Sequence, residues 1–205
     1  MTLKIFDCEQ GSIDWFRCRL GLPTASEFGS VLAKGEGKTR RSYLLKLAAE
    51  VITGEPGESF TTPAMERGKM MEEEARQLYV FVHDPEMVER VGFIKNGLKG
   101  CSPDALLGKG GMLEIKSKRG DLLIDVLLKD EMPPEHKAQV QGALWVAERE
   151  WLDFCAFWPG LPLFVKRIVR DESYIATLSA AVDAFNDELA LTVERVLSYG
   201  GKLAP

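Results

Sequence analysis

The spacing of apolar residues changes along the chain, and each change separates predicted helices from predicted strands. Helical spacing predicts amphipathic helices over residues 42–54, 63–81, 135–149 and 172–198. Thr24 and Glu27 have the spacing of a capping box, so a further short helix is expected to run from there to about Ala33. The long helices must bury their apolar faces against a common core.

Alternating apolar and polar residues predict strands between these helices. The alternation covers residues 87–96, 104–118, 150–158 and 163–170, and glycines divide 104–118 into two strands of a hairpin. Helices therefore precede a group of strands, and a helix, two strands and a last helix follow. This order predicts the α/β (α+β) class, with a mixed central β-sheet flanked by helices in a single domain over residues 1–205.

The composition is that of an ordinary globular protein, with 205 residues of which 45% are hydrophobic and 28% charged. A net charge of -5 argues against a uniformly basic surface for nucleic acid, so any such contact must come from local patches. The chain shows neither an apolar run of membrane-spanning length nor a signal peptide, so a cytoplasmic location is expected. Its four cysteines form no C-x-x-C pair, which favours buried thiols over a metal cluster.

One predicted strand places charges where a sheet core is expected. In Met112-Leu113-Glu114-Ile115-Lys116 the glutamate and the lysine share one face, because side chains two apart on a strand point the same way. Pairing of the hairpin brings Asp104 beside Glu114. Two carboxylates, a backbone carbonyl and waters suit Mg²⁺ on a phosphate substrate, and the lysine would hold the attacking water. From spacing alone, a solvated face with surface ion pairs stays an alternative.

The surrounding motifs resemble those of a known group of nucleases. Pro103-Asp104 and Glu114-Ile115-Lys116 resemble the PD-(D/E)xK superfamily, and the whole chain is similar to the lambda-type phage exonucleases, the YqaJ-like viral recombinase family. The similar blocks keep the family's order and are WFRCRLGLPTASEF (15–28), RGKMMEEEAR (67–76), GCSPDALL (100–107), LEIKSK (113–118) and HKAQVQGALW (136–145). The resemblance implies a restriction-endonuclease-like core.

The resemblance also implies a set of active-site residues. Its metal ligands fall on Asp104, Glu114, the backbone carbonyl of Ile115 and Glu72, with Mg²⁺ as the cofactor and Mn²⁺ as a substitute. Lys116 matches the catalytic lysine, and Gln139 matches a glutamine that orients the site, whereas Gln141 is expected to point elsewhere. Without the resemblance, Gln139 reads equally as a helix-surface amide and Glu72 as part of a solvated acidic face.

A second set of residues implied by the resemblance binds a 5′-phosphate. It falls on Arg19, Ser26 and Ser102, and an arginine fork with hydroxyls near a helix N-terminus suits a dianion. The alternatives are a surface ion pair for Arg19 and an ordinary first-turn residue for Ser26. Trp15 is expected to stack near DNA, although tryptophan is more often a core residue.

Two further features bear on DNA binding. The basic segment with Lys34, Lys38, Arg40 and Arg41 is expected to contact phosphates, which dominate affinity for a duplex. His136 departs from the family pattern, because related chains have a tyrosine there. From the sequence it reads as an exposed helix residue.

The resemblance implies a 5′→3′ exonuclease that uses Mg²⁺ to hydrolyse one strand of linear double-stranded DNA to mononucleotides. The product is a 3′ single-stranded overhang for phage-type recombination by strand annealing. A homotrimeric ring, a phage single-strand annealing protein as partner, and a phage or prophage gene in a bacterial host are also implied. The alternatives are a PD-(D/E)xK endonuclease of different polarity and a DNA-end-binding protein without catalysis. The scattered cysteines disfavour an end-processing nuclease with a cysteine cluster.

Overall fold

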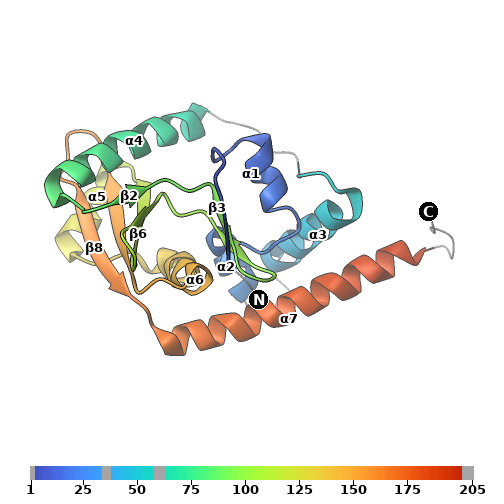
Figure 1. The fold of residues 1–205 in the computed structure, drawn as a ribbon. Helices are drawn as coiled ribbons and strands as arrows, with labels where there is room; N and C mark the ends of the chain where they lie inside the picture. The colour runs from blue at the N-terminus through green and yellow to red at the C-terminus, as the bar shows by residue number, and fades with distance from the viewer. Residues whose placement is uncertain (1–2, 34–37, 58–62, 200–205) are drawn as a thin grey trace.

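The computed structural model describes residues 3–33, 38–57 and 63–199 and shows two β-sheets surrounded by helices (Figure 1). The α-helices are α1 (Ile13–Cys18), α2 (Phe28–Leu32), α3 (Lys38–Thr53), α4 (Pro63–His83), α5 (Gly120–Lys129), α6 (Lys137–Ala147) and α7 (Glu172–Leu197). Two 3₁₀ turns precede α2 and α6, namely η1 (Ala25–Glu27) and η2 (Pro134–His136). None of the described helices is long and apolar enough to cross a membrane.

The larger sheet has five strands in the order β2-β5-β6-β7-β8, and it is mixed as predicted. Its strands are β2 (Val88–Glu89), β5 (Ala105–Leu107), β6 (Gly111–Ser117), β7 (Trp151–Phe157) and β8 (Phe164–Val169). The predicted hairpin is the antiparallel pair β5–β6, whereas β6 and β7 pair in parallel. A parallel pair needs a crossover connection, and α5 and α6 lie within it.

Helices cover both faces of this sheet (Figure 1). On one face, α4 packs against β6 and β7 through Ala75 and Tyr79, which contact Leu113 and Ile115. On the other face, Met112 and its neighbours pack into the main core with α2, α3, α6 and α7. Leu113 and Ile115 thus point away from Glu114, as the period of two predicts. Because the sheet is covered on both faces, a charged side chain on β6 needs a polar partner.

The segment 87–96, predicted as one strand, contributes to two sheets. Its first part is β2, and its second part is β3 (Phe93–Lys95). The latter pairs with β1 (Lys4–Phe6) and β4 (Gly100–Cys101) in a separate three-stranded sheet. Gly92 lies between the two parts and closely approaches the backbone of Cys8, where an added Cβ would clash at 2.2 Å. The alternation of side chains does not reveal such a change of partner.

The predicted capping box at Thr24 is wrong. A 3₁₀ turn follows Thr24, whose side chain makes no capping hydrogen bond, and the α-helix begins only at Phe28. The Thr24 hydroxyl instead accepts a hydrogen bond from Arg19, and Glu27 accepts one from Ser30 at 2.9 Å. Other contacts of these two side chains have therefore replaced the capping hydrogen bonds. The hydrophobic pattern also did not predict the short helices α1 and α5 or the short strands β1 and β4.

A buried carboxylate fastens α4 to the sheet. Asp153 on β7 is 2% exposed, and it accepts hydrogen bonds from the Tyr79 hydroxyl at 2.6 Å and from two nitrogens of Arg167 at 2.9 Å. Burial, followed by the contact with Asp153, raises the pKa of Tyr79, so its hydroxyl stays protonated and remains a donor. This contact fixes the helix that bears Glu72.

Removing the Tyr79 hydroxyl is expected to destabilise the fold. In Tyr79→Phe the buried carboxylate of Asp153 loses one of its donors, which costs about 1–3 kcal/mol of unfolding free energy. Urea unfolding followed by circular dichroism measures this change, with Tyr199→Phe as the control because Tyr199 is 85% exposed. Equal unfolding midpoints for the two variants would contradict a stabilising role for this contact.

Candidate active site

The β5–β6 hairpin places the two predicted acidic ligands opposite each other. Its register pairs Ala105 with Leu113, so Asp104 faces Glu114 one position further along. The amide of Asp104 donates to the carbonyl of Leu113 at 3.0 Å. Asp104 Oδ2 accepts from the amide of Ile115 at 2.5 Å. Asp104 and Glu114 line one cavity of about 250 Å³.

Negative charge is crowded in this cavity. Withdrawal from water, followed by the carboxylates of Glu114 and Glu72, raises the pKa of Asp104 well above its usual range, and the hydrogen bond from Ile115 and the charge of Lys116 only partly oppose the rise. Glu114 itself is 4% exposed. Carboxylates held this close favour either a bound proton or a bound cation between them.

Lys116 and Gln139 both hold Glu114. Glu114 Oε1 lies 2.8 Å from Lys116 Nζ and accepts a hydrogen bond from Gln139 Nε2 at 2.5 Å. Burial acts to lower the pKa of Lys116, but the ion pair with Glu114 outweighs it, and the net shift is upward. Lys116 is therefore an ammonium ion at neutral pH. In that state it can orient a water or an anionic oxygen but cannot accept a proton.

The donor set suits a hard divalent cation. Within residues 3–33, 38–57 and 63–199, no three Asp, Glu, His or Cys side chains gather closely enough to hold a metal ion. The assignment of Asp104, Glu114 and the Ile115 carbonyl as ligands of Mg²⁺, with waters completing an octahedral shell, stays a prediction. Glu72 also lines the cavity, and its carboxylate accepts a hydrogen bond from Arg76 at 2.5 Å. Its role as a further metal ligand stays a prediction.

The predicted phosphate-binding residues line the same cavity as the acidic residues. The Arg19 guanidinium lies over the Trp15 ring, with Cζ 4.0 Å from the ring centroid, and its Nη2 donates to the Thr24 hydroxyl at 3.1 Å. Burial is the main cause that lowers the pKa of Arg19 from its usual value, and nearby Tyr43, Glu50 and Glu27 act against it. In the described part of the chain no carboxylate forms a salt bridge with Arg19.

The two serines approach this arginine from different elements. Ser26 lies in η1 with its Oγ 3.3 Å from the Thr24 hydroxyl, and Ser102 lies in the turn before Asp104, where it accepts from the Trp15 indole at 2.8 Å. Trp15 is half-buried and held by these contacts. The prediction that it stacks on DNA stays a prediction.

The basic segment is only partly described. Lys34 lies outside the described residues, and Lys38 begins α3. Arg40 pairs with Glu188 on α7 at 2.6 Å and lies over the ring of Phe185, so α7 already engages its charge. Arg41 is exposed. The expected phosphate contacts of this segment stay a prediction.

His136 is not the exposed helix residue that the sequence suggested. It lies in η2 with 17% of its side chain exposed and its ring 5.1 Å from that of Phe154. Burial, then the charges of Lys118 and Lys116, lower the pKa of His136 to about 4. It is therefore neutral at physiological pH and adds no positive charge to the site.

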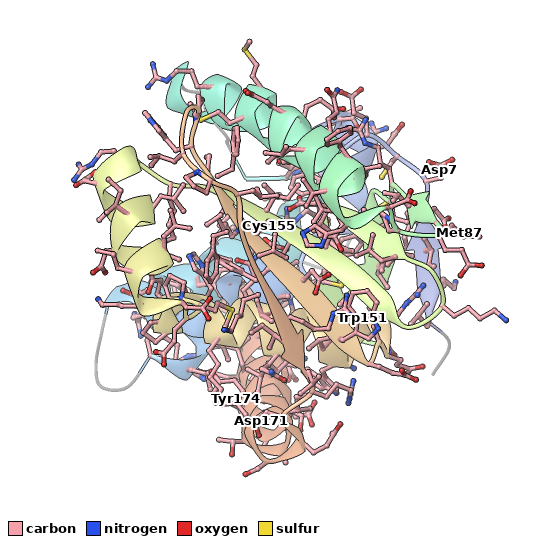
Figure 2. All side chains as sticks on the ribbon, turned by 90° about the vertical axis from the view of Figure 1, so that its left-hand side faces the viewer. Asp7, Met87, Trp151, Cys155, Asp171 and Tyr174 are labelled. Atoms are coloured by element: carbon pink, nitrogen blue, oxygen red, sulfur yellow. The ribbon has the colours of Figure 1, made fainter. Side chains whose placement is uncertain are left out.

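Gln141 has a structural role, in line with its expected direction away from the site. Its amide donates to the Val169 carbonyl at 2.9 Å and accepts from the Asp171 amide at 2.8 Å. These bonds join α6 to the start of α7, where Figure 2 labels Asp171. The four cysteines are free, and Cys101 and Cys155 are buried as predicted, whereas Cys8 and Cys18 are half-buried.

Two residues near the site were not predicted. Gln10 donates to the carbonyls of Val91 and Pro103 at 3.1 and 3.0 Å, which fixes the backbone just before Asp104. Arg76 is 8% exposed and holds Glu72. The partners of Gln10 are 81 and 93 residues away, so no local pattern indicates them. Arg76 follows Glu72 by four residues and Glu73 by three on α4, and this helical spacing of opposite charges is the signal that the sequence offered.

Comparison with known proteins places the chain among viral recombinases. Residues 14–150 match the model of the YqaJ-like viral recombinase domain. The crystal structure of LHK-Exo in complex with dAMP has a TM-score of 0.86 and 32% identity, covering 94% of this chain and 100% of that chain. A second structure of LHK-Exo, an alkaline exonuclease from Laribacter hongkongensis, gives a TM-score of 0.85 with the same identity and coverage.

A phage-related exonuclease from Haemophilus somnus 129PT shares the fold, with a TM-score of 0.59 and 14% identity over 85% of this chain and 96% of that chain. No curated protein sequence matches. The family domain spans well over half of the described fold, and LHK-Exo is related along nearly all of it. The chain therefore belongs to the YqaJ-like viral recombinase family and has the fold of the alkaline exonucleases.

Proposed function

We propose that this protein is a Mg²⁺-dependent exonuclease that degrades one strand of linear double-stranded DNA in the 5′→3′ direction. One observation supports this proposal above all. The acidic cluster of Asp104 and Glu114 lines the same 250 Å³ cavity as Arg19, Ser26 and Ser102. A terminal phosphate bound by the arginine would therefore lie close to the acidic cluster.

Each residue of the proposed site has its own role in phosphodiester hydrolysis. A bound Mg²⁺ would polarise the scissile phosphodiester and generate a nucleophilic water. Lys116, kept as an ammonium ion by Glu114, would orient that water or neutralise the developing charge. The hydrogen bond from Gln139 restricts the orientation of the Glu114 carboxylate. The hydrogen bond from the amide of Ile115 does the same for Asp104. Such preorganised charge is the largest source of rate acceleration in many enzymes.

The proposed product is a mononucleotide, which leaves a 3′ single-stranded overhang. The structure of LHK-Exo contains dAMP, a mononucleotide of the kind proposed here as the product. We further propose a homotrimeric ring, a phage single-strand annealing protein as partner, and a phage or prophage gene acting in the bacterial cytoplasm. The family's designation as viral recombinases supports a phage gene and a role in recombination, and the ring and the annealing partner are proposed from the resemblance of the sequence motifs.

A digestion assay tests the activity directly. A linear duplex incubated with Mg²⁺ is expected to release mononucleotides, and EDTA is expected to stop the release. A covalently closed circle should survive, because it has no end. Cleavage of the circle would indicate an endonuclease. End binding without release of nucleotides in Mg²⁺ or Mn²⁺ would indicate a non-catalytic DNA-end-binding protein.

Mg²⁺ is also expected to stabilise the fold in a pH-dependent manner. Because the folded state raises the pKa of Asp104, its contribution to stability is present below the unfolded pKa and is lost as pH rises through the folded pKa. A cation replaces the lost proton. At a concentration 100 times its Kd it would add about 2.7 kcal/mol, or roughly 5–10 °C in melting temperature.

Thermal melting at pH 8 and pH 5, with and without Mg²⁺, measures this linkage. The rise in melting temperature on adding Mg²⁺ should be larger at pH 8, because protons compete with the cation for the carboxylates at pH 5. Asp104→Asn should lose the gain, and Asp125→Asn, whose carboxylate is exposed and paired with Lys129, should keep it. An equal gain in Asp104→Asn and wild type would place the cation elsewhere.

A further inference from the structure

One tryptophan contacts two of the three proposed phosphate ligands. Trp15 Nε1 donates to Ser102 Oγ at 2.8 Å and more weakly to the Gly92 carbonyl at 3.1 Å. The face of the same ring lies against the Arg19 guanidinium at 4.0 Å. Arg19 belongs to the turn after α1, and Ser102 precedes Asp104. The indole therefore joins two segments that are 83 residues apart in sequence.

The hydrogen bond from the indole fixes the direction of the serine hydroxyl. An indole N–H can only donate, so Ser102 Oγ must accept in this contact. The hydroxyl hydrogen of Ser102 is then available to an acceptor in the cavity that Ser102 lines. A phosphate oxygen is such an acceptor. If the indole N–H were absent, the hydroxyl would be free to turn toward other acceptors.

The same ring also restricts the position of the arginine. The Arg19 Cζ lies 4.0 Å from the centroid of the Trp15 ring, where the cation is attracted to the ring face. One edge of Arg19 is bound by the Thr24 hydroxyl at 3.1 Å, and Thr24 is 4% exposed, which makes it a rigid anchor. The other donors of the fork stay available to an anion in the cavity.

We propose that Trp15 is a positioning residue that sets the preference of this protein for phosphorylated 5′ ends. It directs the donors of Arg19 and Ser102 toward the terminal phosphate and does not bind DNA bases through the ring face that Arg19 covers. This inference rests on the proposed function, because it assigns a means of recognition to the same cavity. A 5′-hydroxyl end lacks the dianion and gains little from these donors.

The test compares initial rates on two blunt duplexes that differ only in a 5′-phosphate or a 5′-hydroxyl. The ratio of the two rates is measured within one protein, so a general loss of activity cancels. Trp15→Phe keeps an aromatic face for Arg19 and removes the N–H donor to Ser102. It is expected to lower the ratio by about threefold to tenfold. Ser102→Ala should lower it by a similar factor.

A double-mutant cycle separates positioning from a merely structural role. If Trp15 acts through the hydroxyl of Ser102, Trp15→Phe should have little further effect on the ratio in the Ser102→Ala background. Replacement of Trp15 by 3-benzothienylalanine, which keeps the bicyclic shape and lacks the N–H, should reproduce the effect of Trp15→Phe. This second variant keeps the test valid if phenylalanine packs poorly.

Trp151→Phe is the matched control. Trp151 also carries an arginine over its ring, with Arg167 Cζ at 3.6 Å from the centroid, but it lies on β7 (Figure 2) and is not among the described residues lining the cavity. The ratio of the rates on the 5′-phosphate and 5′-hydroxyl duplexes should be the same for Trp151→Phe as for wild type. Independent, multiplicative effects of Trp15→Phe and Ser102→Ala would overturn the inference, as would an unchanged ratio in Trp15→Phe. Equal rates on the two duplexes with wild type would instead refute the proposed 5′-end function.

Discussion

Asp104→Asn is expected to lower the rate of DNA hydrolysis roughly a thousandfold, which corresponds to about 4 kcal/mol of transition-state stabilisation. The substitution keeps the shape of the side chain and its oxygen near the amide of Ile115, so the hairpin should remain intact. It removes one of the two carboxylate charges that the cation needs. Glu114→Gln should have an effect of the same order, because its carboxylate also holds Lys116 and Gln139.

Single-turnover digestion of a labelled linear duplex in Mg²⁺ measures this loss, and a gel-shift assay in Ca²⁺ reports whether end binding persists. Asp121→Asn is the control, since this carboxylate is exposed and pairs only with the adjacent Arg119 within the described chain. Turnover within tenfold of wild type in Asp104→Asn and Glu114→Gln would exclude the assignment of these residues as ligands. Lys116→Met, of similar length and without charge, tests the ammonium separately and should also lose most of the rate.

Arg19→Ala is expected to remove most of the preference for a 5′-phosphate while leaving the cation site in place. A charge-assisted hydrogen bond to a phosphate is worth about 1.5–3 kcal/mol, or roughly tenfold to a hundredfold in rate. Arg19 lines the same cavity as Asp104, but within the described residues it forms no salt bridge with the proposed metal ligands. The variant should therefore keep its response to Mg²⁺ in thermal melting.

The experiment uses fixed salt, because phosphate contacts weaken steeply as ionic strength rises. Arg17→Ala is the control, since Arg17 lies on α1 two residues before Arg19, is exposed, and pairs with Asp14. A duplex labelled at either end reports polarity. Release of the 3′ label first would refute the 5′→3′ direction, and an undiminished phosphate preference in Arg19→Ala would remove this arginine from the pocket.

The sequence predicted the parts of the site that depend on local periodicity. Glu114 and Lys116 share a face because they are two residues apart on β6, and the glycine turn placed Asp104 beside them in a hairpin, as the structure confirms. The long helices and the mixed sheet followed from the same periods. Gln139 was singled out only through the family resemblance, and its contact with Glu114 shows how an amide on α6 reaches the strand.

Residues whose partners are far away in the sequence could not be predicted in this way. Thr24 has the local spacing of a helix-capping residue, yet its hydroxyl accepts a hydrogen bond from Arg19. Its backbone amide donates to the hydroxyl of Tyr43 on α3 at 3.1 Å. From the sequence, His136 reads as an exposed helix residue. The aromatic ring of Phe154, from a strand formed later in the chain, covers it instead. Such packing is a property of the tertiary fold.

The register of the β5–β6 hairpin makes the length of its turn a condition for activity. Three residues, Gly108 to Gly110, connect Leu107 with Gly111, and Arg149 binds the carbonyls of Gly108 and Lys109. Loss of one turn residue would slide the strands by a step and bring an apolar side chain opposite Asp104. Insertions and deletions in this loop should therefore be tolerated far less than replacements of its exposed residue, although no atom of the loop takes part in the chemistry.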